Sequence, residues 1–296
     1  MANIPMTSVD VLDSERCELG EGPIWDDRSE ELLWVDIVRR QVHHRSLDGP
    51  RSTVTFEEAV GAVALCRDGG WLLSLEHGPA RSTRSGDVAR LAWFADADPG
   101  PSEMPVRAND AACAPDGRFF AGTMAWDASA SAGALYRLDP GGGPLVRVLD
   151  GVTISNGIGW SPDGRTMYYV DTRTQRVDMF AYDTGTGSLA DRRPGVDIDP
   201  RVGAPDGLTV DAAGAIWVAL WGGGAVHRYA PDGRLDRVLE LPCTQVTSCT
   251  FAGAQLDRLA VTSAFVDLDR PQELAGATFV ADVGVTGLPT NRYDQG

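Results

Sequence analysis

The sequence predicts an all-β fold, a six-bladed β-propeller whose four-stranded antiparallel blades surround a central channel. The first observation is a phrase that recurs along the 296 residues: a short apolar segment, a tight turn and a second apolar segment. The second is its interval of roughly 40 to 50 residues, the length of a propeller blade. The third is that no segment keeps apolar residues at helical spacing for a dozen positions, so helix is a minor component.

Six copies of the phrase mark the two inner strands of the six predicted blades. In chain order they are GPIWDDRSEELLWVDI, GAVALCRDGGWLLSLEHG, NDAACAPDGRFFAGTM, NGIGWSPDGRTMYYVD, PDGLTVDAAGAIWVALW and TSCTFAGAQLDRLAVTSA. The outer hairpins follow them, as in ALYRLDPGGGPLVRVL and VHRYAPDGRLDRVLEL, where two strands flank a turn rich in Asp, Gly and Pro. No linker interrupts the repeat, so residues 1–296 are predicted to form a single domain.

Composition and charge exclude several classes of partner. A net charge of −16 repels nucleic acid and anionic membrane surfaces. No apolar run approaches the ~20 residues of a membrane helix. The N-terminal stretch has neither a basic start nor an apolar core, so no secretion signal is expected. Five cysteines, odd in number and without CxxC spacing, indicate free thiols in a reducing cytoplasm.

Three aromatic or imidazole side chains need a structural interpretation. His43 and His44 are adjacent, so a strand would point them to opposite faces, and both are expected to be exposed hairpin residues rather than metal ligands. Trp126 falls in the loop after the AGTM segment. It either lines a pocket or is simply buried against the surface.

Polar residues are predicted to meet at one mouth of the channel. Each blade begins with a short connection into its innermost strand, and six such connections converge there. The polar residues at these places are Glu21, Arg107, Asn109, Asp110, Asn156, Asp206, Thr247 and Ser248.

Three of these residues have the chemistry of a cation site. Glu21 and Asp206 bring two carboxylates together, and these repel each other and are costly to desolvate without a cation. Asn156 adds an amide oxygen. Because Ca²⁺, Mg²⁺ and Mn²⁺ prefer oxygen ligands, the set predicts a divalent-metal site.

The chain resembles the SMP-30/gluconolactonase/luciferin-regenerating family, often called the regucalcin family. The segments that carry the resemblance are LGEGPIW, RANDAACAPDGRFFAGTM, ISNGIGWSPDGRTMYYVDT and PDGLTVDAAGAIWVALWGGG, and it covers nearly the whole chain. It implies a six-bladed propeller with one catalytic divalent metal ion in the channel, usually hydrolysing lactones. Family analogy also implies a monomer or homodimer.

The family's functional residues map onto positions of this sequence. Its metal ligands fall on Glu21, Asn156 and Asp206, its general base on Asp206, and its substrate contacts on Arg107, Asn109 and Asp127. Ala108 and Ala111 depart from the family's usual residues beside the Asn-Asp pair.

The expected function is that of a cytoplasmic, metal-dependent lactonase. It would open aldono-1,4- or 1,5-lactones, such as gluconolactone, xylonolactone or arabinonolactone, to aldonic acids. The cation, which is Ca²⁺, Zn²⁺, Mn²⁺, Mg²⁺ or Fe²⁺, would stabilise the developing oxyanion. Asp206 would act as base, as ligand or as both, and Arg107 and Asn109 would hold sugar hydroxyls.

Two other functions fit the same residues. An organophosphate or aryl-ester hydrolase would use the same metal site on another electrophile. A non-enzymatic propeller would bind a metal or a sugar without forming product.

Overall fold

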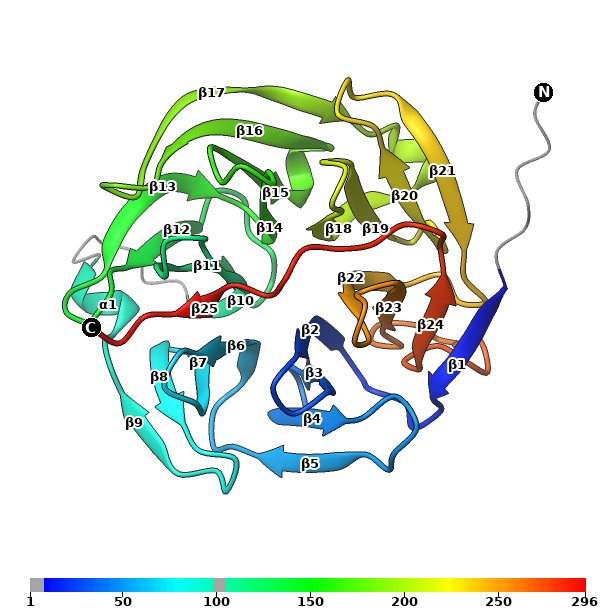
Figure 1. The fold of residues 1–296 in the computed structure, drawn as a ribbon, viewed down its shortest axis with the longest axis horizontal. Coiled ribbons are helices and arrows are strands. Elements are labelled where there is room, and N and C mark those ends of the chain that lie inside the picture. Colours follow the sequence, from blue (N-terminus) through cyan, green and yellow to red (C-terminus); the bar gives the residue numbers. More distant parts are fainter. Residues whose placement is uncertain (1–7, 98–104) are drawn as a thin grey trace.

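Six β-sheets surround a central axis in the computed structural model, which describes residues 8–97 and 105–296 (Figure 1). This architecture confirms the predicted six-bladed propeller. The prediction of a single domain over residues 1–296 stays a prediction. The absence of a secretion signal was predicted from a stretch that begins with residues 1–7, and these lie outside the described residues.

The first three blades follow one another from the N-terminal half of the chain. Blade 1 contains β2 (Gly20–Asp26), β3 (Glu31–Asp36), β4 (Gln41–Arg45) and β5 (Ser52–Thr55). Blade 2 contains β6 (Val60–Cys66), β7 (Trp71–Leu75), β8 (Gly78–Ser82) and β9 (Val88–Arg90), followed by the short helix α1 (Phe94–Ala97). Blade 3 contains β10 (Val106–Cys113), β11 (Phe119–Ala125), β12 (Gly133–Leu138) and β13 (Val146–Val152).

The other three blades complete the circle. Blade 4 contains β14 (Ser155–Trp160), β15 (Thr166–Asp171), β16 (Arg176–Asp183) and β17 (Ser188–Asp197), with a 3₁₀ turn at Thr172–Thr174. Blade 5 contains β18 (Ala204–Val210), β19 (Ile216–Trp221), β20 (Ala225–Tyr229) and β21 (Leu235–Glu240), preceded by a 3₁₀ turn at Pro200–Val202. Blade 6 contains β22 (Val246–Ala252), β23 (Arg258–Ser263), β24 (Thr278–Asp282) and β1 (Val9–Asp13).

The recurring phrase forms the inner hairpin of each blade, as predicted. β10 pairs with β11, β14 with β15, and β18 with β19, all antiparallel. The turn glycines Gly117, Gly164 and Gly214 have positive φ values of 88°, 70° and 83°. A side chain is strained in this left-handed region, so glycine at these places ends one inner strand and starts the next.

Both ends of the chain lock the circle. β1 pairs with β24 and completes blade 6 from the other end of the sequence. β25 (Arg292–Tyr293) runs parallel to β6 and adds a fifth strand to blade 2. The C-terminal segment, red in Figure 1, crosses the propeller face between blades 6 and 2 on its way to β25. These long-range pairings leave no blade open at the chain ends.

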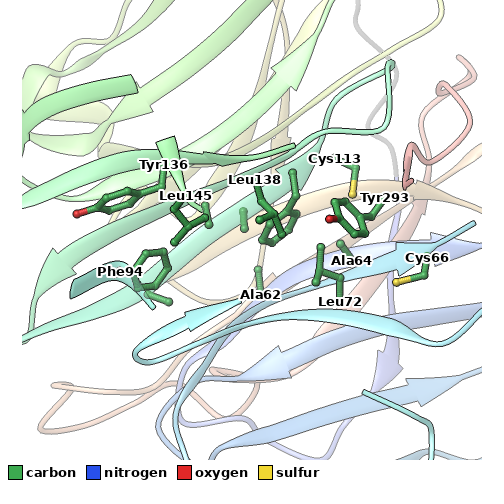
Figure 2. Packing of buried hydrophobic residues seen from close by; sticks show 14 of the residues in the cluster. Ala62, Ala64, Cys66, Leu72, Phe94, Cys113, Tyr136, Leu138, Leu145 and Tyr293 are labelled. Carbon is green, nitrogen blue, oxygen red and sulfur yellow. The ribbon is translucent and has the colours of Figure 1, made fainter. Parts of the chain in front are cut away.

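Apolar side chains fill the spaces between neighbouring blades. Between blades 2 and 3 they include Phe94, Tyr136, Leu138 and Tyr293, with Cys66 and Cys113 at one end (Figure 2). The Tyr293 side chain is 1% exposed, and its hydroxyl donates to the carbonyl of Asp139 (3.0 Å). The C-terminal strand therefore seals this interface with a core residue.

The end of the channel beneath the C-terminal segment holds a cavity of about 150 Å³. Its lining comes from all six innermost strands and from the segment itself, and includes Gly22, Val63, Asp110, Ile158, Leu208, Ser248, Leu288 and Asn291. Among the described residues, no helix is long and apolar enough to cross a membrane.

Candidate active site

All six innermost strands share one irregularity, and it falls at the predicted polar residues. The pairing register slips between Glu21 and Ile24 in β2, between Ala108 and Ala111 in β10, and at the corresponding places in the other four blades. A β-bulge bends a strand and redirects its side chains. The bulges therefore turn one or two side chains per blade toward the channel axis.

Glycine beside two of these polar residues lets neighbouring strands approach closely. A Cβ on Gly157 would lie 2.8 Å from the backbone oxygen of Asp206, and a Cβ on Gly207 would lie 2.1 Å from Oγ of Ser248. Any side chain there would force blades 4, 5 and 6 apart. In the Asn156-Gly157 and Asp206-Gly207 pairs, the first residue carries the polar side chain. The glycine leaves room for the neighbouring innermost strand, so the polar side chain of that strand can lie close by.

A chain of hydrogen bonds fixes the orientation of Asn156. Its Nδ2 donates to Oγ1 of Thr172 (2.8 Å), and that hydroxyl donates to the carbonyl of Pro205 (2.8 Å). The amide oxygen, Oδ1, accepts from Nδ2 of Asn109 (2.8 Å). Because one oxygen lone pair is left over, Asn156 can present it to a ligand in the channel.

Asn109 links this amide to the one buried guanidinium of the cluster. Its Nδ2 also donates to the carbonyl of Ser155 (2.7 Å), so both amide hydrogens are used. Its Oδ1 accepts from Nη1 of Arg107 (2.6 Å). Asn109 therefore positions Asn156 and Arg107 and has only an oxygen lone pair to offer a substrate.

Three carboxyl groups, those of Glu21, Asp110 and Asp206, lie close together in this buried polar cluster. Burial raises the pKa of Glu21 to about 8, with Asp110 adding to the effect. Burial, Glu21 and Asp110 together raise the pKa of Asp206 well above its usual value. Burial raises the pKa of Asp110 to about 6. The pocket therefore disfavours negative charge on all three groups.

The cluster has too little positive charge of its own. Arg107 is 6% exposed and faces Glu21 and Asp206, and burial lowers its pKa to about 10. One guanidinium against three carboxylates leaves a deficit of two positive charges. In addition, Oδ1 of Asp206 is buried with no hydrogen-bond partner among the described residues. A divalent cation on oxygens of Glu21, Asn156 and Asp206 fits both observations.

Trp126 and Glu76 lie where Arg107 approaches the channel mouth. The Arg107 guanidinium lies over the Trp126 ring, 5.1 Å from its centroid. The Trp126 indole donates to Oε1 of Glu76 (3.1 Å), although the side chain is 45% exposed. Trp126 is therefore not simply buried against the surface, and its place in a substrate pocket stays a prediction.

Asp127 lies apart from the polar cluster. It follows β11 in an exposed turn, where its carboxylate accepts from the backbone N–H of Ser129 (3.0 Å). Within the described ranges, no hydrogen bond joins it to Arg107 or Asn109. Its expected role in binding substrate stays a prediction.

The structure adds residues that the sequence analysis missed. Blade 2 contributes Glu76, which follows its second strand and therefore lies outside the places that the repeat marks. Thr172 orients Asn156 from the 3₁₀ turn after β15. Conversely, the hydroxyl of Thr247 already donates its hydrogen to the carbonyl of Gly20 (2.5 Å), so it has no hydrogen left to donate to a ligand. The sequence signal for Thr172 is its position: it follows the Val-Asp pair that ends the second strand in blades 1 and 4.

One expectation about the histidines was wrong. His43 and His44 do point to opposite faces of β4, but His43 is 2% exposed rather than a surface residue. Its ring packs against Trp34, with centroids 5.3 Å apart, toward blade 6. His44 instead meets Trp71 of blade 2 (5.7 Å). Neighbouring blades cover both faces of a middle strand such as β4, so alternating side-chain directions along it do not imply that one set is exposed.

Comparisons with known proteins agree with the fold described above. Residues 19–265 match the family model described as "SMP-30/Gluconolactonase/LRE-like region". The chain is 36% identical to a pentonolactonase of Haloferax volcanii, covering 98% of this chain and 99% of that one. It is also 36% identical to regucalcin of Danio rerio, covering 96% and 98%.

A solved structure has the same fold. It is described as a calcium-binding protein, regucalcin, from Agrobacterium tumefaciens, and it superposes with a TM-score of 0.91 at 31% identity over 99% of both chains. The likeness to a named lactonase supports the enzyme class expected from the sequence. The chain belongs to the SMP-30/gluconolactonase/LRE-like family.

Proposed function

We propose that this lactonase of the SMP-30 family opens sugar lactones to aldonic acids, with one divalent cation held by Glu21, Asn156 and Asp206. The relative from Haloferax volcanii is named a pentonolactonase, which supports five-carbon aldonolactones alongside gluconolactone as substrates. The all-oxygen donor set and a relative described as calcium-binding support Ca²⁺ or another hard cation.

One observation carries the proposal. Glu21, Asn156 and Asp206 come from blades 1, 4 and 5, yet they are all at least nine-tenths buried in one cluster, where Arg107 faces more carboxyl groups than it can neutralise. Two neighbouring carboxyls whose pKa values rise together are destabilising unless a ligand uses them. A structural role for the pair would not explain the unpartnered oxygen of Asp206.

In ester hydrolysis, the cation and Asp206 would have different roles. A bound divalent cation would supply polarisation of the lactone carbonyl. Asp206 takes a proton from the water that adds to the carbonyl carbon and returns it to the ring oxygen as the ring C–O bond breaks. Its raised pKa makes it a stronger base than an ordinary carboxylate, and the cation offsets part of that gain.

Arg107 is the group best placed to bind the sugar. Its Nη1 is used by Asn109 and the carbonyl of Ala108 (2.9 Å), whereas its Nε is buried without a partner among the described residues. Trp126 holds the guanidinium plane from one side. A hydroxyl or ring oxygen of a neutral polyol would satisfy the free Nε–H.

Charge also gives the reaction a direction. The lactone is neutral when it enters, whereas the aldonate product is an anion leaving a protein of net charge −16. Long-range repulsion by the whole protein therefore favours escape of the product once it has left the cation and Arg107.

A continuous pH-indicator assay tests the proposal. Purified protein would be stripped with chelator, then given each divalent cation in turn with gluconolactone, xylonolactone or arabinonolactone, and spontaneous hydrolysis would be subtracted. We expect acid release that vanishes with chelator and returns with a cation. Asp206→Asn should lose activity by about a hundredfold or more. Asp232→Asn, in an exposed turn of blade 5, serves as the matched control and should retain it.

Other outcomes would replace the proposal. Full activity in verified metal-free protein would contradict the cation's role. Turnover of phosphotriesters or aryl esters well above that of every lactone would favour the ester hydrolase. Tight cation binding by folded protein with no product from any substrate would indicate a binding propeller.

A further inference from the structure

We propose that Cys17, Asp36 and His43 form a second metal site, of the kind that binds Zn²⁺, in the interface between blades 1 and 6. One donor atom from each of the three side chains lies within 4.8 Å of the other two. Cys17 lies between β1 and β2, Asp36 ends β3, and His43 lies in β4. This site is separate from the pocket of Asn156 and Asp206 and goes beyond the proposed lactonase function.

All three side chains are hidden from solvent. Cys17 is 1% exposed, Asp36 is 0% and His43 is 2%. A tetrahedral zinc ion with bonds of about 2.0–2.3 Å keeps its ligand atoms about 3.3–3.7 Å apart. Small side-chain rotations would close the trio to that spacing, with no change in the course of the strands.

The imidazole of His43 carries the strongest indication of a ligand. Its Nδ1 is bonded to Oγ1 of Thr53 (2.9 Å), whereas its Nε2 is buried with no partner among the described residues. Burial lowers the pKa of His43 to about 3, so the ring is neutral and one nitrogen carries a lone pair. Zinc-bound histidines have this arrangement, with the second ring nitrogen oriented by a hydrogen bond.

Cys17 and Asp36 supply the charge that a zinc ion needs. Burial and the nearby Asp36 raise the pKa of Cys17 to about 12, so the thiol stays protonated without a metal. On binding, the thiol proton leaves to solvent, and the thiolate and the Asp36 carboxylate, which also pairs with Arg39 (3.7 Å), face the two positive charges of the ion. The indole N–H of Trp34 is buried near Cys17 without a hydrogen-bond partner among the described residues and would donate to a thiolate there.

A comparison between blades shows which part of the trio is unusual. Asp36 accepts from the backbone N–H groups of Glu18 (2.7 Å) and Leu19 (3.3 Å). Asp171 ends the corresponding strand of blade 4 and accepts in the same way from Thr153 (3.0 Å) and Ile154 (3.1 Å). The carboxylate therefore has a structural role common to both blades.

Blade 4 lacks the other two donors of blade 1. Trp34 pairs with His43 across β3 and β4, and in blade 4 the same place pairs Tyr169 with Asp178, which is neutralised by arginines. At the place of Cys17, one residue before the first N–H donor, blade 4 has Val152. Blade 1 thus adds a thiol and an imidazole beside a carboxylate that both blades share.

The donor types separate the two metal sites. Thiolate and imidazole favour Zn²⁺ and Co²⁺, whereas the oxygen donors of Glu21, Asn156 and Asp206 suit hard cations such as Ca²⁺. Because the second site is buried, its metal must be taken up while the chain folds. Expression in medium supplemented with Co²⁺ or Zn²⁺ therefore loads it, and later exchange should be slow.

The test combines metal content with the absorption spectrum of the full chain. Protein made in Co²⁺ medium and then dialysed against Ca²⁺ should retain about one cobalt per chain and show thiolate-to-cobalt charge transfer. Cys17→Ser should abolish that band, whereas Cys249→Ser, which alters a cysteine equally buried between blades 5 and 6, should leave it intact. Asp206→Asn should also leave it intact, so failure of the lactonase proposal would be seen separately.

Two results would overturn the second site. Wild-type protein without retained metal and without the band, from either medium, would show that the trio binds no zinc-type ion. A band that persists in Cys17→Ser would assign the thiolate to another cysteine. If Cys17→Ser does not fold, His43→Gln provides the same comparison, with a weakened and shifted band expected.

Discussion

Removing the buried carboxyl of Glu21 should stabilise the metal-free protein, and the gain should depend on pH. Glu21 is 7% exposed, and its pKa rises from 4.5 to about 8 on folding because the pocket disfavours its charge. Between these two values the folded state binds more protons than the unfolded chain. Stability therefore falls as the pH rises from about 4.5 to 8 and is constant above that.

The size of the effect follows from the two pKa values. At ~1.4 kcal/mol per pKa unit, the ionised Glu21 costs on the order of 3–5 kcal/mol of folding free energy above pH 8. Roughly 2 kcal/mol of that is lost between pH 6.5 and 8. This pH window avoids the effect of His43, whose pKa is lowered to about 3 on folding. Titration of His43 makes the unfolding free energy rise with pH, but only below its unfolded pKa of about 6.5.

Urea unfolding in the presence of chelator measures the effect. We expect the unfolding free energy of the wild type to fall from pH 6.5 to pH 8, and that of Glu21→Gln to be higher at pH 8 and flatter. Saturating cation at a hundred times its Kd should stabilise the wild type by about 2.7 kcal/mol and the variant by less. Parallel profiles for the two proteins, with no gain in the variant, would refute the claim that Glu21 is a strained buried acid.

Three further predictions concern residues around the site and the core. Asn109→Ala should weaken cation binding by about tenfold as well as raise KM, because Asn109 orients Asn156; titration calorimetry showing unchanged cation affinity would instead make it a direct substrate contact. Gly157→Ala should cost about 2–4 kcal/mol in urea unfolding, since its Cβ would lie 2.8 Å from the Asp206 carbonyl oxygen, and a neutral effect would mean that the blades can separate freely. Tyr293→Ala should lower stability by about 3–5 kcal/mol by leaving a cavity between blades 2 and 3; a calorimetric Tm equal to that of the wild type would show that the C-terminal strand is dispensable.

The fold was predictable because the propeller repeats its local signals. Six turns at a steady interval, with alternating apolar strands around them, indicate the blades without any knowledge of tertiary contacts. The chain ends carry no such signal. The pairing of β1 with β24 and the position of β25 beside β6 join segments that are hundreds of residues apart, and nothing in their short sequences names the partner.

The site was predictable to the extent that it follows the repeat. Glu21, Asn109, Asn156 and Asp206 occupy equivalent places in different blades, so the repeat alone is enough to predict that they converge. Glu76 could not be found in this way, because it lies after a second strand rather than before a first one. Its contact with Trp126 depends on loop geometry.

Burial was the property that sequence periodicity described least well. An alternating strand outside the core suggests exposed side chains, and both His43 and His44 were expected to be exposed. In a propeller each sheet is covered on both faces by neighbouring blades: in blade 1, His44 meets Trp71 of blade 2, and Trp34 beside His43 packs with Ala252 and Ala260 of blade 6. Polar residues in the middle strands are therefore candidates for buried function.

The polar cluster at the channel mouth is asymmetric, and under the proposed function this asymmetry would orient a bound ester. Blades 1, 4 and 5 provide the oxygens of Glu21, Asn156 and Asp206, whereas blade 3 provides Arg107. A lactone carbonyl directed at a cation among those oxygens would leave its ring and hydroxyl groups toward Arg107 and Trp126. A ring of identical blades could not distinguish the two ends of a substrate. Among the described residues, Arg107 of blade 3 is the one basic side chain of the cluster, and it and its neighbour Trp126 would therefore distinguish the two ends of a bound substrate.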